Sequence, residues 1–286
     1  MDAAITSRDD VRRVLVAGDT HGNTAWVEGL VRTAAEQNCP VVIQVGDFGY
    51  FPDHADGPRF LTAVDTACAR HGVEFWFIDG NHDDHFALAK HRKSGTPVAL
   101  TDHVSYIPRG ARIAPGGLGF GFLGGAFSVD WRDRIHGIDW WPDEMPDHSD
   151  LVRLGDDPLD VLITHDAPAG LDLAASRLPA EDQVRADEAR STIATAVGAT
   201  QPRLVFHGHW HHAHDTALSW IDRSATEQTG ALTWQSTRVI GLSCDGDTAG
   251  GWLVFDLDRR DICWPPTAAT APTAQGRTDV GMEVEP

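Results

Sequence analysis

Six short apolar runs, each ending in Gly, Asp or His, are the feature that most limits how this 286-residue chain can fold. Each run is rich in β-branched or aromatic residues and has the length of a buried strand. The runs span residues 11–18, 40–46, 74–80, 118–125, 159–165 and 203–208. Helical patterns lie between several of them, at 24–38, 59–72 and 181–198. Strands that alternate with helices predict βαβ units and a largely parallel sheet.

Two later apolar runs, at 236–244 and 250–258, come without helices between them and favour antiparallel hairpin strands. A sheet-on-sheet core with helices outside accommodates both kinds of run, so we expect one α/β domain over residues 11–263. We expect residues 1–10 to be a flexible N-terminus. The Pro/Ala/Thr-rich segment 264–286 has almost no large apolar side chains to bury, which predicts a disordered tail.

The composition narrows the class of partner. The formal net charge of -19 creates a negative field that repels phosphate backbones, so extended nucleic acid is an unfavourable partner. No apolar run is long enough to span a membrane, and residues 1–10 lack the apolar core of a secretory signal. The four cysteines are scattered, which fits reduced thiols. We therefore expect a cytoplasmic protein without a membrane partner.

Polar side chains follow five of the predicted strands at the point where each strand ends. They are Asp19 and His21, then Asp47, then Asn81 and His82, then His165, and finally His209 and His211. In open α/β sheets, ligands bind outside the carboxyl ends of the strands, where the loops converge. Carboxylate oxygens and imidazole nitrogens suit ions such as Zn, Mn, Fe and Co. The sequence therefore predicts one metal site, with Asp47 as a carboxylate that can bridge two ions.

These segments, read in order as DTH, GD, GNHD, TH and GHWH, resemble the signature of the calcineurin-like metallophosphoesterases. The resemblance extends over residues 19–211. It implies a four-layer αββα sandwich with two mixed β-sheets. It also implies a dinuclear phosphoesterase, in which a metal-bridging hydroxide attacks the phosphate ester of a small phosphorylated substrate.

The resemblance also assigns roles by position. Asp19, His21, Asp47 and His211 would hold one divalent ion, and Asp47, Asn81, His165 and His209 the other. His82 would act as general acid or as a donor to the transition state. Manganese is the favoured ion for both positions, with Fe, Zn, Co and Ni as alternatives. The second ring nitrogen of a ligating histidine usually donates a hydrogen bond to an acceptor nearby. We expect the acceptors to be Asp83, Asp166 and Asp215.

One motif departs from the pattern of the protein Ser/Thr phosphatases in this superfamily. Tyr50 and Phe51 stand where those enzymes carry an aspartate and an arginine. A small phosphodiester or phosphomonoester is therefore the expected substrate, and Tyr50 becomes a candidate substrate contact. A protein Ser/Thr phosphatase, and a metal-binding scaffold without turnover, are the alternatives.

The long segment 124–150 predicts a loop over the site, because long loops in compact domains are often functional. Arg132 and Arg134 on this loop can bind a phosphate, since the guanidinium fork matches phosphate geometry. The alternative is that both arginines pair with nearby aspartates and only hold the loop. The remaining histidines of the cluster 207–214 are interpreted as supporting or loop residues: His207, His212 and His214.

Overall fold

The apolar runs form strands whose successive side chains point to opposite faces. In β1 (Arg13–Ala17), Val14 and Val16 belong to one hydrophobic core, whereas Leu15 and Ala17 belong to another. The computed structural model describes residues 8–173, 178–221, 230–231 and 234–265. In this part of the chain the strands form two mixed sheets.

The first sheet has seven strands. Its order is β13 (Asp261–Cys263), β12 (Trp252–Asp256), β1, β2 (Val41–Gln44), β3 (Glu74–Phe77), β5 (Val104–Tyr106) and β4 (Val98–Ala99). Four adjacent strands, β1, β2, β3 and β5, are parallel. The pairings outside these four are antiparallel, between β13 and β12, between β12 and β1, and between β4 and β5. The apolar run at 250–258 is therefore an antiparallel strand, as expected.

The second sheet has six strands and is built in the same way. Its order is β10 (His214–Ile221), β11 (Trp234–Gly241), β9 (Leu204–His207), β8 (Val161–Thr164), β7 (Phe120–Leu123) and β6 (Arg112–Ile113). Strands β7, β8, β9 and β11 are parallel, and β10 and β6 are antiparallel to their neighbours. The run at 236–244 thus pairs antiparallel with β10 on one side and parallel with β9 on the other. The expected hairpin with the run at 250–258 was wrong, because that run lies in the first sheet.

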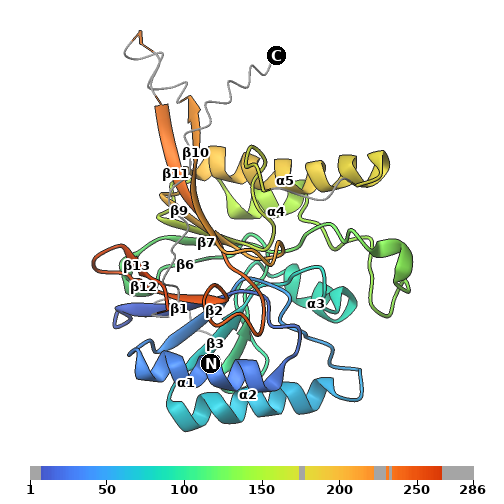
Figure 1. Cartoon of the computed structure of the whole chain (residues 1–286), viewed down its shortest axis with the longest axis vertical. Coiled ribbons are helices and arrows are strands. Elements are labelled where there is room, and N and C mark those ends of the chain that lie inside the picture. The colour runs from blue at the N-terminus through green and yellow to red at the C-terminus, as the bar shows by residue number, and fades with distance from the viewer. Residues whose placement is uncertain (1–7, 174–177, 222–229, 232–233, 266–286) are drawn as a thin grey trace.

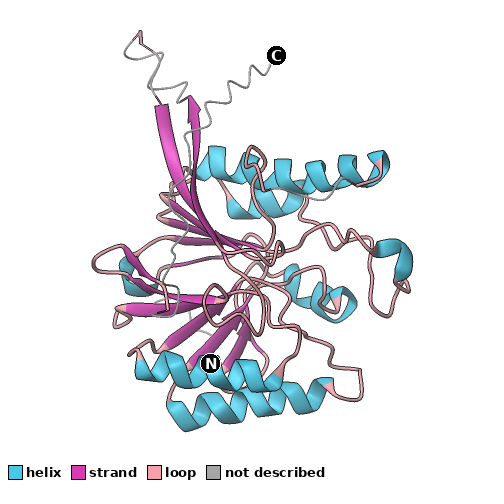
Figure 2. Ribbon diagram, in the orientation of Figure 1, coloured by secondary structure: helices cyan, strands magenta, loops and turns pink. Residues whose placement is uncertain are grey.

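Helices cover the outer face of each sheet (Figures 1 and 2). On the first sheet lie α1 (Thr24–Glu36), α2 (Gly57–His71) and α3 (His85–Arg92), and on the second α4 (His148–Leu154) and α5 (Ala180–Thr200). Two short 3-10 helices, η1 (Pro115–Gly117) and η2 (Trp131–Asp133), lie in connections. One core lies between the sheets, and one lies under the helices of each side. This arrangement is the four-layer αββα sandwich expected from the sequence.

The described ends of the chain pack against the domain. Arg8 forms an ion pair with Glu74 at the start of β3, so the described part of the segment predicted to be flexible is held on the first sheet. At the other end, Trp264 packs against the core between the sheets. Residues 1–7 and 266–286, which include most of the predicted tail, lie outside the described residues. No helix in the described part of the chain is long and apolar enough to cross a membrane.

The carboxyl ends of strands from both sheets meet at one edge of the sandwich. Backbone hydrogen bonds connect the loops there, from Thr20 N to Asp47 O at 3.1 Å and from Gly208 N to His165 O at 3.0 Å. A hydrogen bond also joins the two sheets, from the ring of His165, which follows β8, to Val45 O, which follows β2. The loops after β1, β2, β3, β8 and β9 are therefore fixed against one another.

Candidate metal centre

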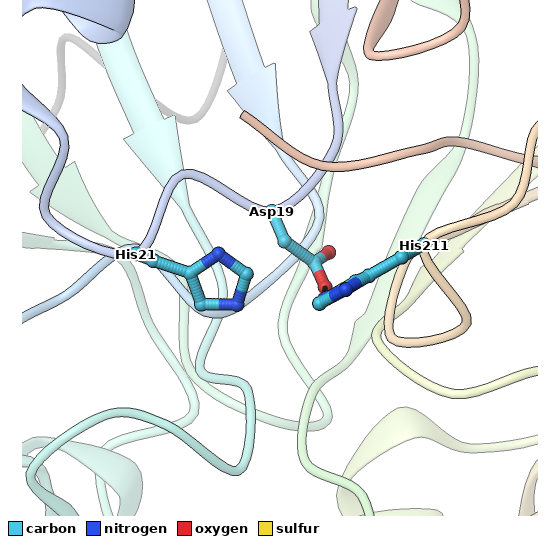
Figure 3. A group of neighbouring side chains, drawn as sticks. All are labelled: Asp19, His21 and His211. Carbon is cyan, nitrogen blue, oxygen red and sulfur yellow. Dashed lines mark ion pairs between the residues drawn. The ribbon is translucent and has the colours of Figure 1, made fainter. Parts of the chain in front are cut away.

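The first group of candidate ligands surrounds Asp19, which follows β1. The carboxylate of Asp19 lies between the imidazoles of His21 and His211 (Figure 3). His211 Nε2 is 3.0 Å from Asp19 Oδ2, and His21 Nε2 is 3.5 Å from Asp47 Oδ2. One ligand atom from each of Asp19, His21 and His211 lies within 4.8 Å of the other two. The side chains predicted for one ion are thus brought together.

The second group centres on His165, which follows β8 and is fully buried. Its Nδ1 donates to Val45 O at 2.9 Å, so its Nε2 faces the site. From there Nε2 is 3.3 Å from Asp47 Oδ1 and 3.1 Å from Asn81 Oδ1. The His209 ring contacts the His165 ring edge-on at 5.1 Å. Asp47 therefore lies between both groups, in the position predicted for a bridging carboxylate.

The backbone at these positions is itself unusual. His21, Asp47, His209 and His211 have positive φ angles of 45°, 56°, 64° and 49°. Residues with side chains rarely adopt this conformation, and it concentrates at functional sites where the surrounding structure enforces it. Among the described residues, only three other non-glycine positions share it. The fold therefore maintains strain at four of the seven candidate ligands.

Three motif glycines pack directly against candidate ligands. A Cβ on Gly80 would lie 2.1 Å from Asp47 Oδ1, and one on Gly208 would lie 2.0 Å from Asp19 Oδ1. A Cβ on Gly46 would lie 2.3 Å from His165 Nδ1. Only glycine leaves room for the carboxylates and the imidazole at these places. The glycines in the motifs thus have a steric role in addition to allowing tight turns.

The charge balance of the site favours bound cations. Asp19 and Asp47 are both buried, and their oxygens lie within 4.8 Å of each other. Burial alone would lower the pKa of His165, but the charge of Asp47 outweighs it and raises the pKa to about 10. The pKa of His21 is raised to about 9 in the same way, against burial, by its hydrogen bond and charge interaction with Asp47. Two buried carboxylates need positive charge nearby, and divalent ions would supply it in place of these protons.

Supporting contacts come partly from residues that the motifs do not contain. His21 Nδ1 donates to Asp245 Oδ1 at 3.1 Å, which turns its Nε2 toward the site. Asn81 Nδ2 donates to Ser128 Oγ at 3.1 Å, and that hydroxyl donates to the buried Glu144. Such contacts fix the orientation of ligands. Asp245 had a signal in the sequence, since it follows the run 236–244 just as Asp19 and Asp47 follow theirs.

The three aspartates expected to support the histidines have other partners. Asp83 accepts hydrogen bonds from backbone N–H groups, including Gly49 and Tyr50 at 2.8 Å, and so ties the loop after β2 to the loop after β3. Asp166 accepts from Trp210 Nε1, and Asp215 pairs with Arg238. The hydrogen bonds and ion pairs of these three carboxylates go to those donors and not to the ligand imidazoles, so the structure does not bear that prediction out.

Arg134 reaches the site from the long loop. Its guanidinium contacts His82 Nε2 and forms an ion pair with Asp130 at 2.7 Å. His82 N, in the loop after β3, donates to Asp47 Oδ1 at 2.7 Å, so Arg134 contacts a residue that is itself bonded to the candidate bridging carboxylate. Burial lowers the pKa of His82, and the positive charge of Arg134 lowers it further, against the charge of Asp47. His82 is therefore neutral here, and its Nε2 accepts from the arginine, which has only donors.

Two other predicted substrate contacts lie elsewhere. Arg132 pairs with Asp182 of α5 and lies over the Trp131 ring, which holds the loop rather than the site. Tyr50 is buried in the core between the first sheet and its helices, where its ring packs against Phe77. Burial of this ring in the core is favourable because it removes apolar surface from water. For both residues the structure contradicts the predicted role.

The remaining histidines of the 207–214 cluster fall outside the candidate ligands. His207 is buried, and its Nε2 lies 2.9 Å from His214 Nε2, so these two rings contact each other behind the site. His212 is exposed. Their placement agrees with an interpretation as supporting and loop residues.

The comparisons with known proteins agree with this geometry. The family model of the calcineurin-like phosphoesterases matches residues 12–213. Among solved structures, TT1561 of Thermus thermophilus is 15% identical, with a TM-score of 0.52 over 89% of this chain and 98% of that chain. A dimetal phosphatase from Danio rerio is 12% identical, with a TM-score of 0.50 over 85% and 92% of the two chains. At these identities the structural likeness bears on the fold alone. A search of curated proteins found no match.

Proposed function

Because the chain belongs to the calcineurin-like phosphoesterase family, we propose that it is a metal-dependent phosphoesterase that hydrolyses a small phosphorylated substrate. The observation that carries the proposal is the convergence of two buried carboxylates, Asp19 and Asp47, with imidazoles from both sheets. This donor set of oxygen and nitrogen atoms fits divalent ions such as Mn, Fe, Zn, Co or Ni. Manganese remains our first choice for the experiment below.

In this proposal Asp19, His21, Asp47 and His211 hold one ion, and Asp47, Asn81, His165 and His209 hold the other. Two such ions supply Lewis acidity that polarises a phosphoryl oxygen and acidifies a bound water. The protein's own contribution is to fix the donors before the ions arrive. The bonds from His165 to Val45 and from His21 to Asp245 do this, since each leaves one ring nitrogen facing the site.

His82 and Arg134 act on the substrate itself. Arg134 is held by Asp130 with its guanidinium at the site, where it can clamp a phosphate through two parallel hydrogen bonds. A phosphate that takes over these donors frees His82 Nε2, which can then take up a proton from solvent and donate it to the leaving oxygen. Arg134 thus takes the place of the arginine that Phe51 replaces in the second motif.

Turnover by metal-stripped protein, with and without added Mn²⁺, tests the proposal. The substrates are p-nitrophenyl phosphate and bis(p-nitrophenyl) phosphate. We expect Mn²⁺ to restore hydrolysis of at least one of them, and His82→Asn to lower kcat roughly 10²-fold or more while Mn²⁺ binding by calorimetry persists. A protein that binds Mn²⁺ yet hydrolyses neither ester would be a scaffold.

The substrate class follows from what surrounds the site. A protein Ser/Thr phosphatase is disfavoured, because Tyr50 is a buried phenol in place of a carboxylate and Phe51 has no charge. The net charge of -19 disfavours long nucleic acids. A phosphate ester of modest size, attracted by the ions and by Arg134, is the substrate that these features favour.

A further inference from the structure

Two cavities of similar size flank the candidate metal centre. One, of ≈ 500 Å³, is lined by His21 and His82 together with Phe51, His54 and other residues before and in α2. The other, of ≈ 490 Å³, is lined by His209 and Asp166. Each cavity therefore shares a wall with a different half of the site. A phosphate bound between them would have room for an organic group on each side.

The second cavity has a largely apolar wall. It is lined by the side chains of Phe127, Val129, Leu173, Leu178, Ala186 and Trp210. Arg190, from α5, lies over the Trp210 ring at 5.2 Å and donates to Leu171 O at 2.9 Å, which fixes that wall. Asp166 holds the same indole through its Nε1 at 2.8 Å. Specific side-chain contacts therefore hold the wall of this cavity in place next to the candidate ligand His209.

The long loop lines the second cavity and contacts two residues that line the first, His82 and Phe51. Phe127 and Val129 belong to its first part and line the apolar cavity, whereas Arg134 reaches His82 at the other one. Trp141, near the end of the loop, lies 6.4 Å from the Phe51 ring. A phosphate held by Arg134 therefore lies under a loop that borders the space on each side.

We propose that the natural substrate is a phosphodiester whose two esterified organic groups, here called arms, differ. The retained arm is apolar and lies in the cavity lined by Trp210, and the leaving arm lies beside His82. This inference rests on the proposed function. A phosphomonoester has one arm and would leave one cavity without a use. In the hydrolysis, water supplies the oxygen of the new P–O bond, and the bond from phosphorus to the leaving oxygen breaks with its electron pair. The protons of the water pass to the leaving oxygen and to solvent.

Two chromogenic diesters separate the arms, phenyl p-nitrophenyl phosphate and methyl p-nitrophenyl phosphate, assayed with Mn²⁺-loaded protein. The leaving group is the same, so a difference in kcat/KM reports the retained arm. We expect the phenyl ester to be favoured roughly tenfold, since an apolar group in a matching pocket is worth that much. Calorimetry with diphenyl and dimethyl phosphate gives a second readout, in which the diphenyl compound binds more tightly.

Matched variants locate the effect. Val129→Asp places a charge at the rim of the cavity, and Val152→Asp makes the same change on α4, outside it; the two residues are 52% and 67% exposed. Ala186→Phe fills the cavity from α5, and Ala199→Phe adds the same ring at an exposed position of that helix. We expect the first variant of each pair to bring the phenyl preference close to one, and the second to keep it.

Each outcome separates the inference from the proposed function. A phenyl preference near one in the unmodified protein overturns the inference while hydrolysis upholds the function. Cleavage of p-nitrophenyl phosphate but of neither diester has the same meaning. Failure to cleave any of the three esters with any divalent ion overturns the proposed function, and the inference with it. Equal effects of Val129→Asp and Val152→Asp would show that the cavity is not the binding place.

Discussion

Replacing Gly80 with alanine tests whether the motif glycines set the positions of the candidate ligands. The added Cβ would lie 2.1 Å from Asp47 Oδ1, 2.2 Å from Asp47 N and 2.7 Å from His165 Nε2. To restore an ordinary contact of 3.4 Å, the carboxylate would have to retreat by about 1.3 Å, and the backbone of the loop would have to move with it. Gly80 needs no positive φ, so the clash alone produces the effect.

A displacement of this size at a reacting centre lowers turnover by roughly 100-fold. We therefore expect Gly80→Ala to lose about that factor in kcat/KM for the better p-nitrophenyl ester, and to bind Mn²⁺ more weakly in calorimetry. Circular dichroism and a thermal melt would show that the variant is folded. An unchanged kcat/KM in a folded Gly80→Ala protein would refute the reasoning.

Gly198→Ala is the matched control for this change. Gly198 lies in α5 with nothing within 4 Å of an added Cβ, and it also needs no positive φ. Alanine there removes conformational freedom from the unfolded chain and favours the helix. We expect the free energy of unfolding to rise by about 0.5–1 kcal/mol, with kcat/KM and Mn²⁺ affinity unchanged.

Three further predictions concern side chains around the site. Arg134→Ala should lower kcat/KM roughly 100-fold, as loss of a preorganised donor does, whereas Arg132→Ala should leave it unchanged; steady-state kinetics on one ester decides between them. Asp245→Ala should weaken Mn²⁺ binding roughly tenfold in calorimetry, because the ring of His21 loses its acceptor. Burial and nearby arginines hold the pKa of His85 well below its ordinary value. Below about pH 6.5 this histidine is therefore protonated in the unfolded chain but not in the folded chain. Stability then falls with falling pH by up to about 1.4 kcal/mol per unit, and urea unfolding of His85→Gln between pH 7.5 and pH 5 should show a shallower fall. Parallel pH profiles of the two proteins would contradict this account of His85.

The fold and most of the metal centre were predictable because they depend on local patterns. A short apolar run marks each buried strand, and a parallel sheet brings the residues after its strands to one edge. Asp19, Asp47 and His165 could therefore be placed together without knowledge of the contacts between them. The left-handed backbone of His209 and His211 was not readable, since neither residue type requires it.

The loop residues could not be assigned in this way. Arg132 and Arg134 are two positions apart and chemically identical, yet one pairs with α5 and the other reaches His82. The difference depends on Asp182, about 50 residues further along the chain, whose position only the tertiary structure determines. The substrate contact predicted for Tyr50 was wrong for a similar reason. A ring next to a motif can be buried in a neighbouring core, and only the tertiary structure shows which core that is.

The origin of the ligands in both sheets has a consequence for the life of the protein in a cell. Candidate ligands follow three strands of the first sheet and two of the second: Asp19, His21, Asp47 and Asn81, and then His165, His209 and His211. Ions bound between them would join the two halves of the sandwich and would bind the native chain but not the unfolded one. Free metal at a thousand times its Kd adds about 4 kcal/mol to the stability of such a protein. Metal supply would then set how long each molecule escapes proteolysis, as well as whether it is active.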